Sequence, residues 1–252
     1  MKILQVSAEL FPLIKTGGLA DVAGALPAAL KGQGCDLRPL LPGYPEVWRG
    51  FRLEREVGRF QLPWGEPARV VQGELAGALT GYVLDLPSRF NRSGNPYEDS
   101  LKQPYADNHL RFAALCWAGA HLARGLDAEW HPHIVHAHDW HAGLLPACLR
   151  QWALAPGQAD VRSVFTIHNL AYQGLFGRGE FDALGLNGDF FQPEGLEFHG
   201  AMSFMKAGIF YSDLVTTVSP RYAQEIQTSE QGCGLDGLLR QRSGSLQGIL
   251  NG

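Results

Sequence analysis

The chain has 252 residues and a formal net charge of −4, so it lacks the positive field with which proteins attract nucleic acid. No run approaches the ~18 uninterrupted apolar residues of a membrane span, so the sequence argues against a membrane partner too. Hydrophobic residues make up 45%, enough to build one large α/β domain or two small ones, and the four widely spaced cysteines favour a reducing, cytoplasmic location.

Short, mostly apolar segments alternate along the chain with segments of helical periodicity. The expected strands are residues 3–7, 36–41, 134–138, 163–168 and 214–218. The expected helices are residues 19–30, 108–125, 143–152, 200–211 and 221–227. This alternation predicts an α/β fold with a Rossmann-like, doubly wound and mostly parallel sheet.

Two stretches after the second strand break this alternation. Residues 51–87 contain short segments typical of antiparallel strands, which predicts a small antiparallel insertion. Residues 88–107 are polar and rich in turn formers, so we expect a long surface loop there.

The first helix is preceded by the loop "KTGGLAD", which places Lys15, Gly17 and Gly18 at its start. A helix N-terminus offers unpaired N–H groups and a partial positive charge, and glycines let an anion approach the backbone closely. The loop therefore suits a phosphate group. The pattern is neither GxGxxG nor a Walker loop, so a simple turn with a solvated lysine is an open alternative.

A second cluster of polar residues lies in "HIVHAHDWHAGLLP", where His136, His138, Asp139 and His141 follow or end a strand. Imidazoles and a carboxylate at the carboxyl end of a strand can hydrogen-bond a hydroxyl-rich ligand. They can also bind zinc, although the aspartate stands one position early for a metallo-hydrolase motif. Histidines with a purely structural role in the core are the third possibility.

A third cluster follows the strand of "VFTIHNLAYQG", where His168, Asn169, Tyr172 and Gln173 stand close together. Neutral donors and acceptors next to an aromatic ring are typical of a sugar pocket. A capping turn would explain the same residues without any ligand.

Taken together, these motifs resemble those of bacterial glycogen synthases and plant starch synthases. The segments that carry the resemblance occur in the family's order and reach from residue 2 to residue 252: "KTGGLADV", "NPY", "HAHDWHAGL", "TIHNLAYQG", "SFMKAGIFYSD", "TTVSPRYAQEI" and "GILNG". The resemblance implies a retaining glucosyltransferase of the two-domain GT-B architecture. Such an enzyme transfers glucose from ADP-glucose, or from UDP-glucose in some relatives, to the non-reducing end of an α-1,4-glucan such as glycogen, without a metal or another cofactor.

The resemblance also implies roles for individual residues. Lys15, His168 and Asp139 are the expected catalytic residues, with Lys15 on the donor's diphosphate and His168 on the transferred glucose. The remaining expected contacts to substrate are Gly17, Gly18, Asp21, Tyr97, His141, Asn169, Gln173 and Asn251. Among these, Gly17 and Gly18 face the diphosphate, Tyr97 lies on a flexible loop, and Asn251 lies at the crossover between the domains.

Members of the family are nearly twice as long as this chain. We therefore expect residues 1–252 to be the N-terminal catalytic domain, with the C-terminal nucleotide-binding domain absent and required for a complete site. The chain alone is then expected to be inactive. Two other hypotheses stay open: a stand-alone glucan-binding module without catalysis, and a zinc hydrolase built on His136, His138 and His141.

Overall fold

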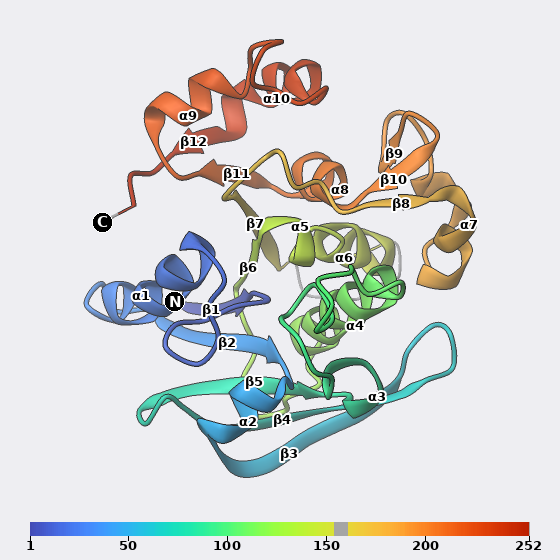
Figure 1. The fold of residues 1–252 in the computed structure, drawn as a ribbon. Coiled ribbons are helices and arrows are strands. Elements are labelled where there is room, and N and C mark those ends of the chain that lie inside the picture. The colour runs from blue at the N-terminus through green and yellow to red at the C-terminus, as the bar shows by residue number, and fades with distance from the viewer. Residues whose placement is uncertain (154–160, 252) are drawn as a thin grey trace.

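The computed structural model describes residues 1–153 and 161–251, in which helices cover a large central sheet (Figure 1). Its parallel strands are β1 (Lys2–Val6), β2 (Asp36–Pro42), β5 (Leu79–Asp85), β6 (Ile134–His138), β7 (Arg162–Ile167), β11 (Leu214–Thr217) and β12 (Leu246–Gly248). They lie in the order β12-β11-β7-β6-β1-β2-β5. Val6 of the central strand is aligned with Leu40 on one side and with Ala137 on the other.

The order of these strands and their burial confirm the predicted doubly wound sheet. Most residues of β1, β2, β6 and β7 are buried, as expected for parallel strands that are covered on both faces. Every strand that the sequence predicts is present within one or two residues of its expected bounds.

The helices of the described residues are α1 (Gly18–Lys31), α2 (Pro45–Arg49), α3 (Pro87–Phe90), α4 (Asn108–Ala123), α5 (Asp139–Ala142), α6 (Leu145–Ala153), α7 (Arg178–Phe181), α8 (Phe204–Tyr211), α9 (Pro220–Glu225) and α10 (Asp236–Gln241). Short 3-10 turns occur at Asp182–Leu184, Gly188–Phe190 and Ser243–Ser245. None of the helices in this part of the chain has the length and apolar character that a membrane crossing requires.

Helices α1 and α4 pack on opposite faces of β1. The side-chain amide of Gln5 donates to the carbonyl of Ala23 in α1 at 2.9 Å. A Cβ built on Gly119 of α4 would lie 3.2 Å from a methyl group of Val6. Because successive residues of a strand point to opposite faces, these two contacts place the two helices on different sides of the sheet.

The predicted insertion is antiparallel, but it extends the main sheet rather than forming a small sheet of its own. Strands β3 (Phe51–Gln61) and β4 (Pro67–Leu75) continue the sheet beyond β5, and β3 is its outer edge. Residues along β3 are mostly exposed and several are charged, with Arg52 and Arg55 in ion pairs to neighbouring segments. Charges on an edge strand discourage pairing with other chains.

The predicted helix over residues 200–211 is wrong at its start. Residues Ala201–Ser203 form strand β10, which pairs with β8 (Leu175–Gly177) and β9 (Glu197–Phe198) in a separate three-stranded antiparallel sheet within the described residues. His199 and Gly200 have positive φ values of 51° and 85°, which form the turn between β9 and β10. The helix begins only after Ser203, whose hydroxyl caps it by accepting from the N–H of Lys206.

The helix predicted over residues 143–152 is also different in the structure. A short helix, α5, begins four residues earlier at Asp139, and α6 follows it after Gly143 and Leu144. A Cβ on Gly143 would lie 2.1 Å from the carbonyl oxygen of Phe204, so only glycine allows this close approach to α8. The early start of α5 places Asp139 and His141 directly at the end of β6.

Candidate active site

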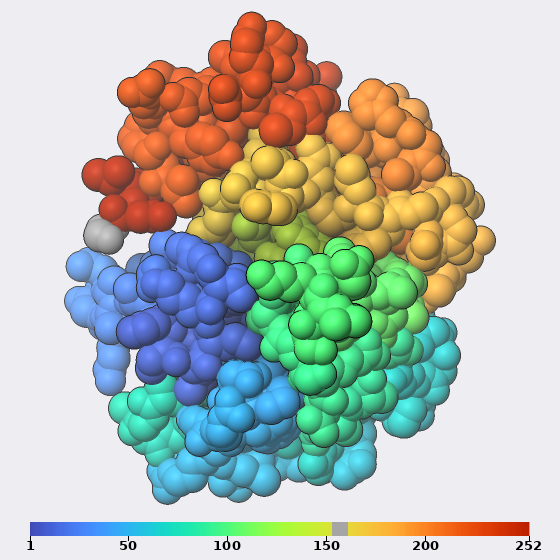
Figure 2. Space-filling model, viewed as in Figure 1, coloured from blue at the N-terminus to red at the C-terminus, as the bar shows by residue number. Residues whose placement is uncertain are grey.

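The carboxyl ends of β1, β6, β7 and β11 surround a cavity of about 790 Å³. Its lining comes from residues 9 and 16–19, from the loop between 95 and 108, from residues 139–141, 168, 169, 172 and 174–176, and from residues 218 and 251. Figure 2 shows several of these segments, coloured blue, green and gold, meeting on one face of the molecule. Parallel sheets bind their ligands at this edge.

The loop before α1 contributes its glycines to the cavity but not its lysine. Gly17 and Gly18 belong to the lining, and a Cβ built on either would have no heavy atom within 4 Å. The Nζ atom of Lys15 lies 2.7 Å from both carboxylate oxygens of Asp21, and both side chains are about half exposed. Lys15 and Asp21 therefore stand beside the cavity and pair with each other.

Glu9 is the residue of this region that the sequence prediction misses. Its carboxylate is 2% exposed and accepts the N–H of Thr16 at 2.5 Å, the hydroxyl of Thr16 at 2.6 Å and the N–H of Gly17 at 3.3 Å. The hydroxyl of Tyr97 donates to the same carboxylate. The predicted anion-binding backbone is thus partly occupied by the Glu9 carboxylate. The N–H group of Ala20 donates to the carbonyl of Gly17 at 3.3 Å, which leaves the N–H groups of Gly18 and Leu19 for a ligand.

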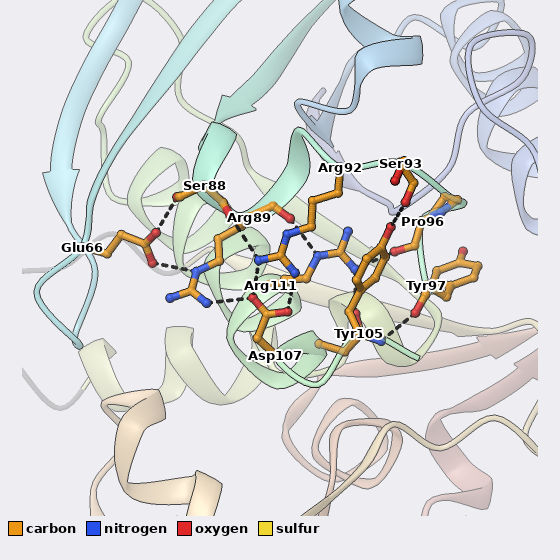
Figure 3. A network of polar contacts seen from close by, with 11 residues as sticks. Glu66, Ser88, Arg89, Arg92, Ser93, Pro96, Tyr97, Tyr105, Asp107 and Arg111 are labelled. Atoms are coloured by element: carbon orange, nitrogen blue, oxygen red, sulfur yellow. Dashed lines mark hydrogen bonds and ion pairs between the residues drawn. The ribbon is translucent and has the colours of Figure 1, made fainter. Parts of the chain in front are cut away.

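A network of arginines holds the loop that carries Tyr97 (Figure 3). Arg111 of α4 is 1% exposed, and its guanidinium donates to the carbonyls of Arg89 and Pro96 at 2.9 and 2.8 Å. It also donates to the side chain of Asn108, whose amide in turn donates to the carbonyl of Tyr97 at 2.9 Å. The expected surface loop is therefore tied to the N-terminal end of α4 and forms a wall of the cavity.

Ion pairs extend this network toward the sheet. Arg89 and Arg92 both contact the carboxylate of Asp107, at 2.8 and 2.7 Å, and Arg89 also reaches Glu66 at 2.8 Å (Figure 3). These hydrogen bonds hold the pKa of the Asp107 carboxyl below its usual value against the effect of its partial burial. The loop between α3 and α4 is consequently anchored at both of its ends.

Asp139 is a buried carboxyl group in an unusual backbone conformation. Its φ of 58° lies in the left-handed region, and its Oδ1 accepts the N–H of Trp140 at 3.0 Å. Burial raises the pKa of Asp139 to about 8, and the negative charge of Glu9 adds to this effect. Near neutral pH the carboxyl is therefore largely protonated, so it can donate a hydrogen bond to an oxygen of a ligand in the cavity.

Three of the histidines form a connected group below the cavity. Nδ1 of His138 lies 3.0 Å from Nε2 of His168, and the rings of His136 and His138 lie 4.1 Å apart between centroids. Nε2 of His136 lies 2.6 Å from the hydroxyl of Thr166. Burial lowers the pKa of His168 to about 4 and that of His136 to about 3, so all three rings are neutral at physiological pH.

The remaining predicted contacts divide into two groups. His141 lines the cavity and stacks on Tyr97 with 4.5 Å between ring centroids. Asn169 and Asn251 also line it, although Oδ1 of Asn169 accepts the N–H of Ala171 and so caps a turn as well. Gln173 does not line the cavity, because its buried side chain donates to the carbonyl of Cys233 at 2.8 Å.

The zinc hypothesis finds no matching arrangement among residues 1–153 and 161–251, where no group of three or more histidine, cysteine, aspartate or glutamate side chains is placed to hold a metal ion. Two of the three histidines it invokes, His136 and His138, each have a ring nitrogen hydrogen-bonded to another side chain.

Comparison with known proteins shows which family the chain belongs to. Residues 2–241 match the family model of the starch synthase catalytic domain. The chain belongs to this family. It is 57% identical over 257 residues to a glycogen synthase of Variovorax paradoxus (strain S110) and 52% identical over 257 residues to one of Leptothrix cholodnii. Both alignments cover 100% of the chain and 52% and 53% of these relatives, so the chain spans about half of their length.

Solved structures agree with this assignment to the starch synthase family. The catalytic domain of starch synthase IV from Arabidopsis thaliana, bound to ADP and acarbose, superimposes with a TM-score of 0.85 at 29% identity. The match covers 99% of the chain and 51% of the plant protein. The predicted fold class, the N-terminal half of a GT-B glycosyltransferase, is thereby confirmed.

In this family member, the eleven site residues predicted from the sequence divide clearly by position. The cavity brings together Gly17, Gly18, Tyr97, Asp139, His141, His168, Asn169 and Asn251, which come from widely separated segments. Lys15 and Asp21 lie at its margin, and Gln173 is part of the supporting scaffold. Glu9 and Arg111 have no motif around them, and their burial among polar partners is visible only in three dimensions.

Proposed function

We propose that the chain supplies the N-terminal domain of a glucosyltransferase that moves glucose from ADP-glucose to the non-reducing end of an α-1,4-glucan such as glycogen, with retention of configuration. The observation that carries this proposal is the composition of one cavity. It combines the N-terminus of α1 with imidazoles whose pKa is lowered by burial, a carboxyl whose pKa is raised by burial to about 8, amide groups and aromatic rings. A nucleotide sugar needs both a phosphate site and a sugar site.

The donor's diphosphate fits the start of α1. The N–H groups of the first turn and the helix dipole favour an anion there, and Gly17 and Gly18 leave the approach open. The ion pair of Lys15 with Asp21 is exposed and contributes little to stability, so the lysine can turn toward a phosphate without unfolding cost. Negative charge that develops on the departing phosphate is stabilised by these groups.

The transferred glucose fits the other side of the cavity, where uncharged donors and acceptors gather. His168 and Asp139 come from the ends of adjacent strands, β7 and β6, and both are neutral near pH 7 because of burial. Neutral groups can bind sugar hydroxyls without placing a charge next to the positive character that the sugar ring gains in the transition state. Tyr172, which is 66% exposed at the cavity, offers an aromatic face to the acceptor glucan.

A second domain completes this site in our proposal. The starch synthase family resemblance implies that the opposing half brings cationic groups to the diphosphate. Two such contacts contribute about 1.5–3 kcal/mol each, so their loss weakens donor binding roughly a hundredfold or more. An open cleft also admits water, which weakens every electrostatic contribution to transition-state stabilisation.

The experiment joins residues 1–252 to the second half of the Variovorax paradoxus glycogen synthase and measures incorporation of labelled glucose into glycogen from ADP-glucose and from UDP-glucose. We expect transfer by the fusion and little or none by either half alone. Anomeric analysis of the product should show retention. A folded fusion that binds glycogen but transfers nothing from either donor would favour the glucan-binding module. Robust turnover by the isolated chain would contradict the two-domain site.

A further inference from the structure

The hydrogen bond between His138 and His168 connects a buried residue to a residue that lines the cavity. His138 ends β6 and is fully buried, whereas His168 follows β7 and is partly exposed. His138 is aligned with Thr166 in the parallel pair, so His168 lies two positions beyond its partner and its ring reaches back to Nδ1 of His138 at 3.0 Å. Each ring is neutral, so each carries one N–H group.

Two arrangements of protons satisfy this hydrogen bond. Either His138 donates from Nδ1 to Nε2 of His168, or His168 donates from Nε2 to Nδ1 of His138. The environment of the other nitrogen of His138 distinguishes them. Its Nε2 is buried and has no hydrogen-bond partner among the described residues.

The second arrangement puts a proton on that nitrogen and leaves a buried N–H group without an acceptor. The first arrangement leaves only an unused lone pair there. Orphaned buried N–H groups are rarer in folded proteins than under-used acceptors, so the first arrangement is favoured. It leaves Nε2 of His168 as the acceptor and therefore places the proton of His168 on Nδ1.

We propose that His138 is a positioning residue that donates from Nδ1 to Nε2 of His168 and thereby holds His168 as the Nδ1–H tautomer, a hydrogen-bond donor to a sugar oxygen in the cavity. The sugar as ligand rests on the proposed function above, whereas the tautomer rests on the hydrogen-bond geometry of two neutral rings.

The neighbours of His138 hold its ring in the orientation that this role requires. The ring of His136 packs against it in a tilted arrangement, with 4.1 Å between centroids and 33° between the ring planes. His136 is held in turn by the hydroxyl of Thr166, which lies 2.6 Å from the hydroxyl of Thr216 in β11. A row of polar side chains thus runs under the cavity across β6, β7 and β11 and restrains the rotation of His138.

The decisive experiment records long-range proton–nitrogen correlation spectra of the isotope-labelled chain at neutral pH, with the ring signals assigned by side-chain experiments. These spectra identify which nitrogen of each imidazole carries the proton. We expect the Nδ1–H form for both His138 and His168. A proton on Nε2 of His168 would overturn the proposal, and this result does not depend on any enzymatic activity.

Two substitutions test the positioning role in the fusion protein described above. His138→Asn keeps an amide donor near the position of Nδ1, whereas His138→Leu removes the donor and leaves an apolar side chain. We expect His138→Leu to give a mixture of His168 tautomers and to lower kcat at least about tenfold. His138→Asn should retain most of the Nδ1–H tautomer of His168 and most of kcat.

A purely structural role for His138 predicts a different pattern. Its signs would be a lower melting temperature for both variants, with the tautomer of His168 and kcat unchanged in whatever fraction stays folded. That pattern would refute the positioning role. If the fusion transfers no glucose at all, the proposed function fails while the spectra still decide the tautomer.

Discussion

Tyr97 and Glu9 are joined by a hydrogen bond although 88 positions separate them in the sequence. Tyr97 lies on the loop between α3 and α4, and Glu9 follows β1. The same carboxylate accepts the backbone N–H groups of Thr16 and Gly17. A single buried group therefore fixes the position of the helix N-terminus relative to the loop that faces it across the cavity.

Replacing this carboxylate by an amide should loosen both segments. Glu9→Gln has one acceptor oxygen instead of two and turns an amide N–H₂ toward donors, so we expect it to lower the free energy of unfolding by about 2 kcal/mol. Tyr97→Phe should cost about 1 kcal/mol, and the double variant should cost less than the sum because the two residues interact. Denaturant titration measures the free energy of unfolding of the two single variants and of the double variant. The control is Glu194→Gln at an exposed position, and a Glu9→Gln variant as stable as this control would contradict the role of Glu9.

Arg111→Lys should detach the loop while keeping the charge. Lysine presents a single ammonium group and cannot reach the carbonyls of Arg89 and Pro96 together with the side chain of Asn108. We expect a loss of at least about 2 kcal/mol in the free energy of unfolding and faster proteolysis within residues 91–107. The matched control is Arg49→Lys, because that guanidinium is largely exposed. Equal protease resistance of the two variants would count against the anchoring role.

Asp139 gives the stability of the chain a distinctive dependence on pH. Burial raises its pKa from 3.8 to about 8, so between these values the folded chain holds a proton that the unfolded chain has released. The carboxyl group therefore lowers the free energy of unfolding progressively as pH rises from 3.8 to about 8, with no further change above that pH. Asp139→Asn removes this dependence and keeps a residue type that tolerates the left-handed backbone.

The measurement is the difference in unfolding free energy between Asp139→Asn and the wild type at a series of pH values. We expect it to shift in favour of the variant as pH rises through this window. The buried histidines change the stability in the opposite direction. Because burial lowers the pKa values of His168 and His136 from 6.5, the free energy of unfolding decreases as pH falls below about 6.5. Both are present in wild type and variant, so they cancel in the difference. A difference that stays constant across the pH series would show that Asp139 is not protonated in the folded chain.

Lys15→Ala should separate catalysis from stability. The ion pair with Asp21 is half exposed, so its loss should change the free energy of unfolding by no more than about 1 kcal/mol. In the fusion protein, removal of a cation that stabilises the departing phosphate should lower kcat about a hundredfold. Lys31→Ala, an exposed lysine at the other end of α1, serves as the control for helix charge. Unchanged kcat in the Lys15 variant would remove the lysine from the donor site.

Much of the sheet could be predicted because buried parallel strands leave a direct pattern in the sequence. Each is a short apolar run, and polar residues such as His168 and Asp139 follow at the end where ligands bind. Helix α9 begins one residue before its expected start at 221, because Ser219 caps it and Pro220 occupies its first position. Convergence of these strand ends on one cavity follows from the parallel arrangement alone.

Other parts of the structure leave no such pattern. Strands β8, β9 and β10 have two or three residues each, too few to show an alternation of polar and apolar positions. Glu9 and Arg111 are buried polar residues that each hydrogen-bond two backbone groups, and backbone groups are the same in every sequence. That Lys15 pairs with Asp21 beside the cavity depends on side-chain conformation, which spacing does not specify.

The hydrogen bonds of Arg111 determine how the wall of the cavity responds to added salt. All three acceptors of its hydrogen bonds are uncharged oxygens, and the guanidinium is shielded from solvent. Neither added salt nor a change of pH alters such acceptors, whereas the partly exposed pairs of Arg89 and Arg92 with Asp107 weaken as ionic strength rises. The cavity wall that carries Tyr97 should therefore keep its shape at high salt concentration, after the neighbouring ion pairs have loosened.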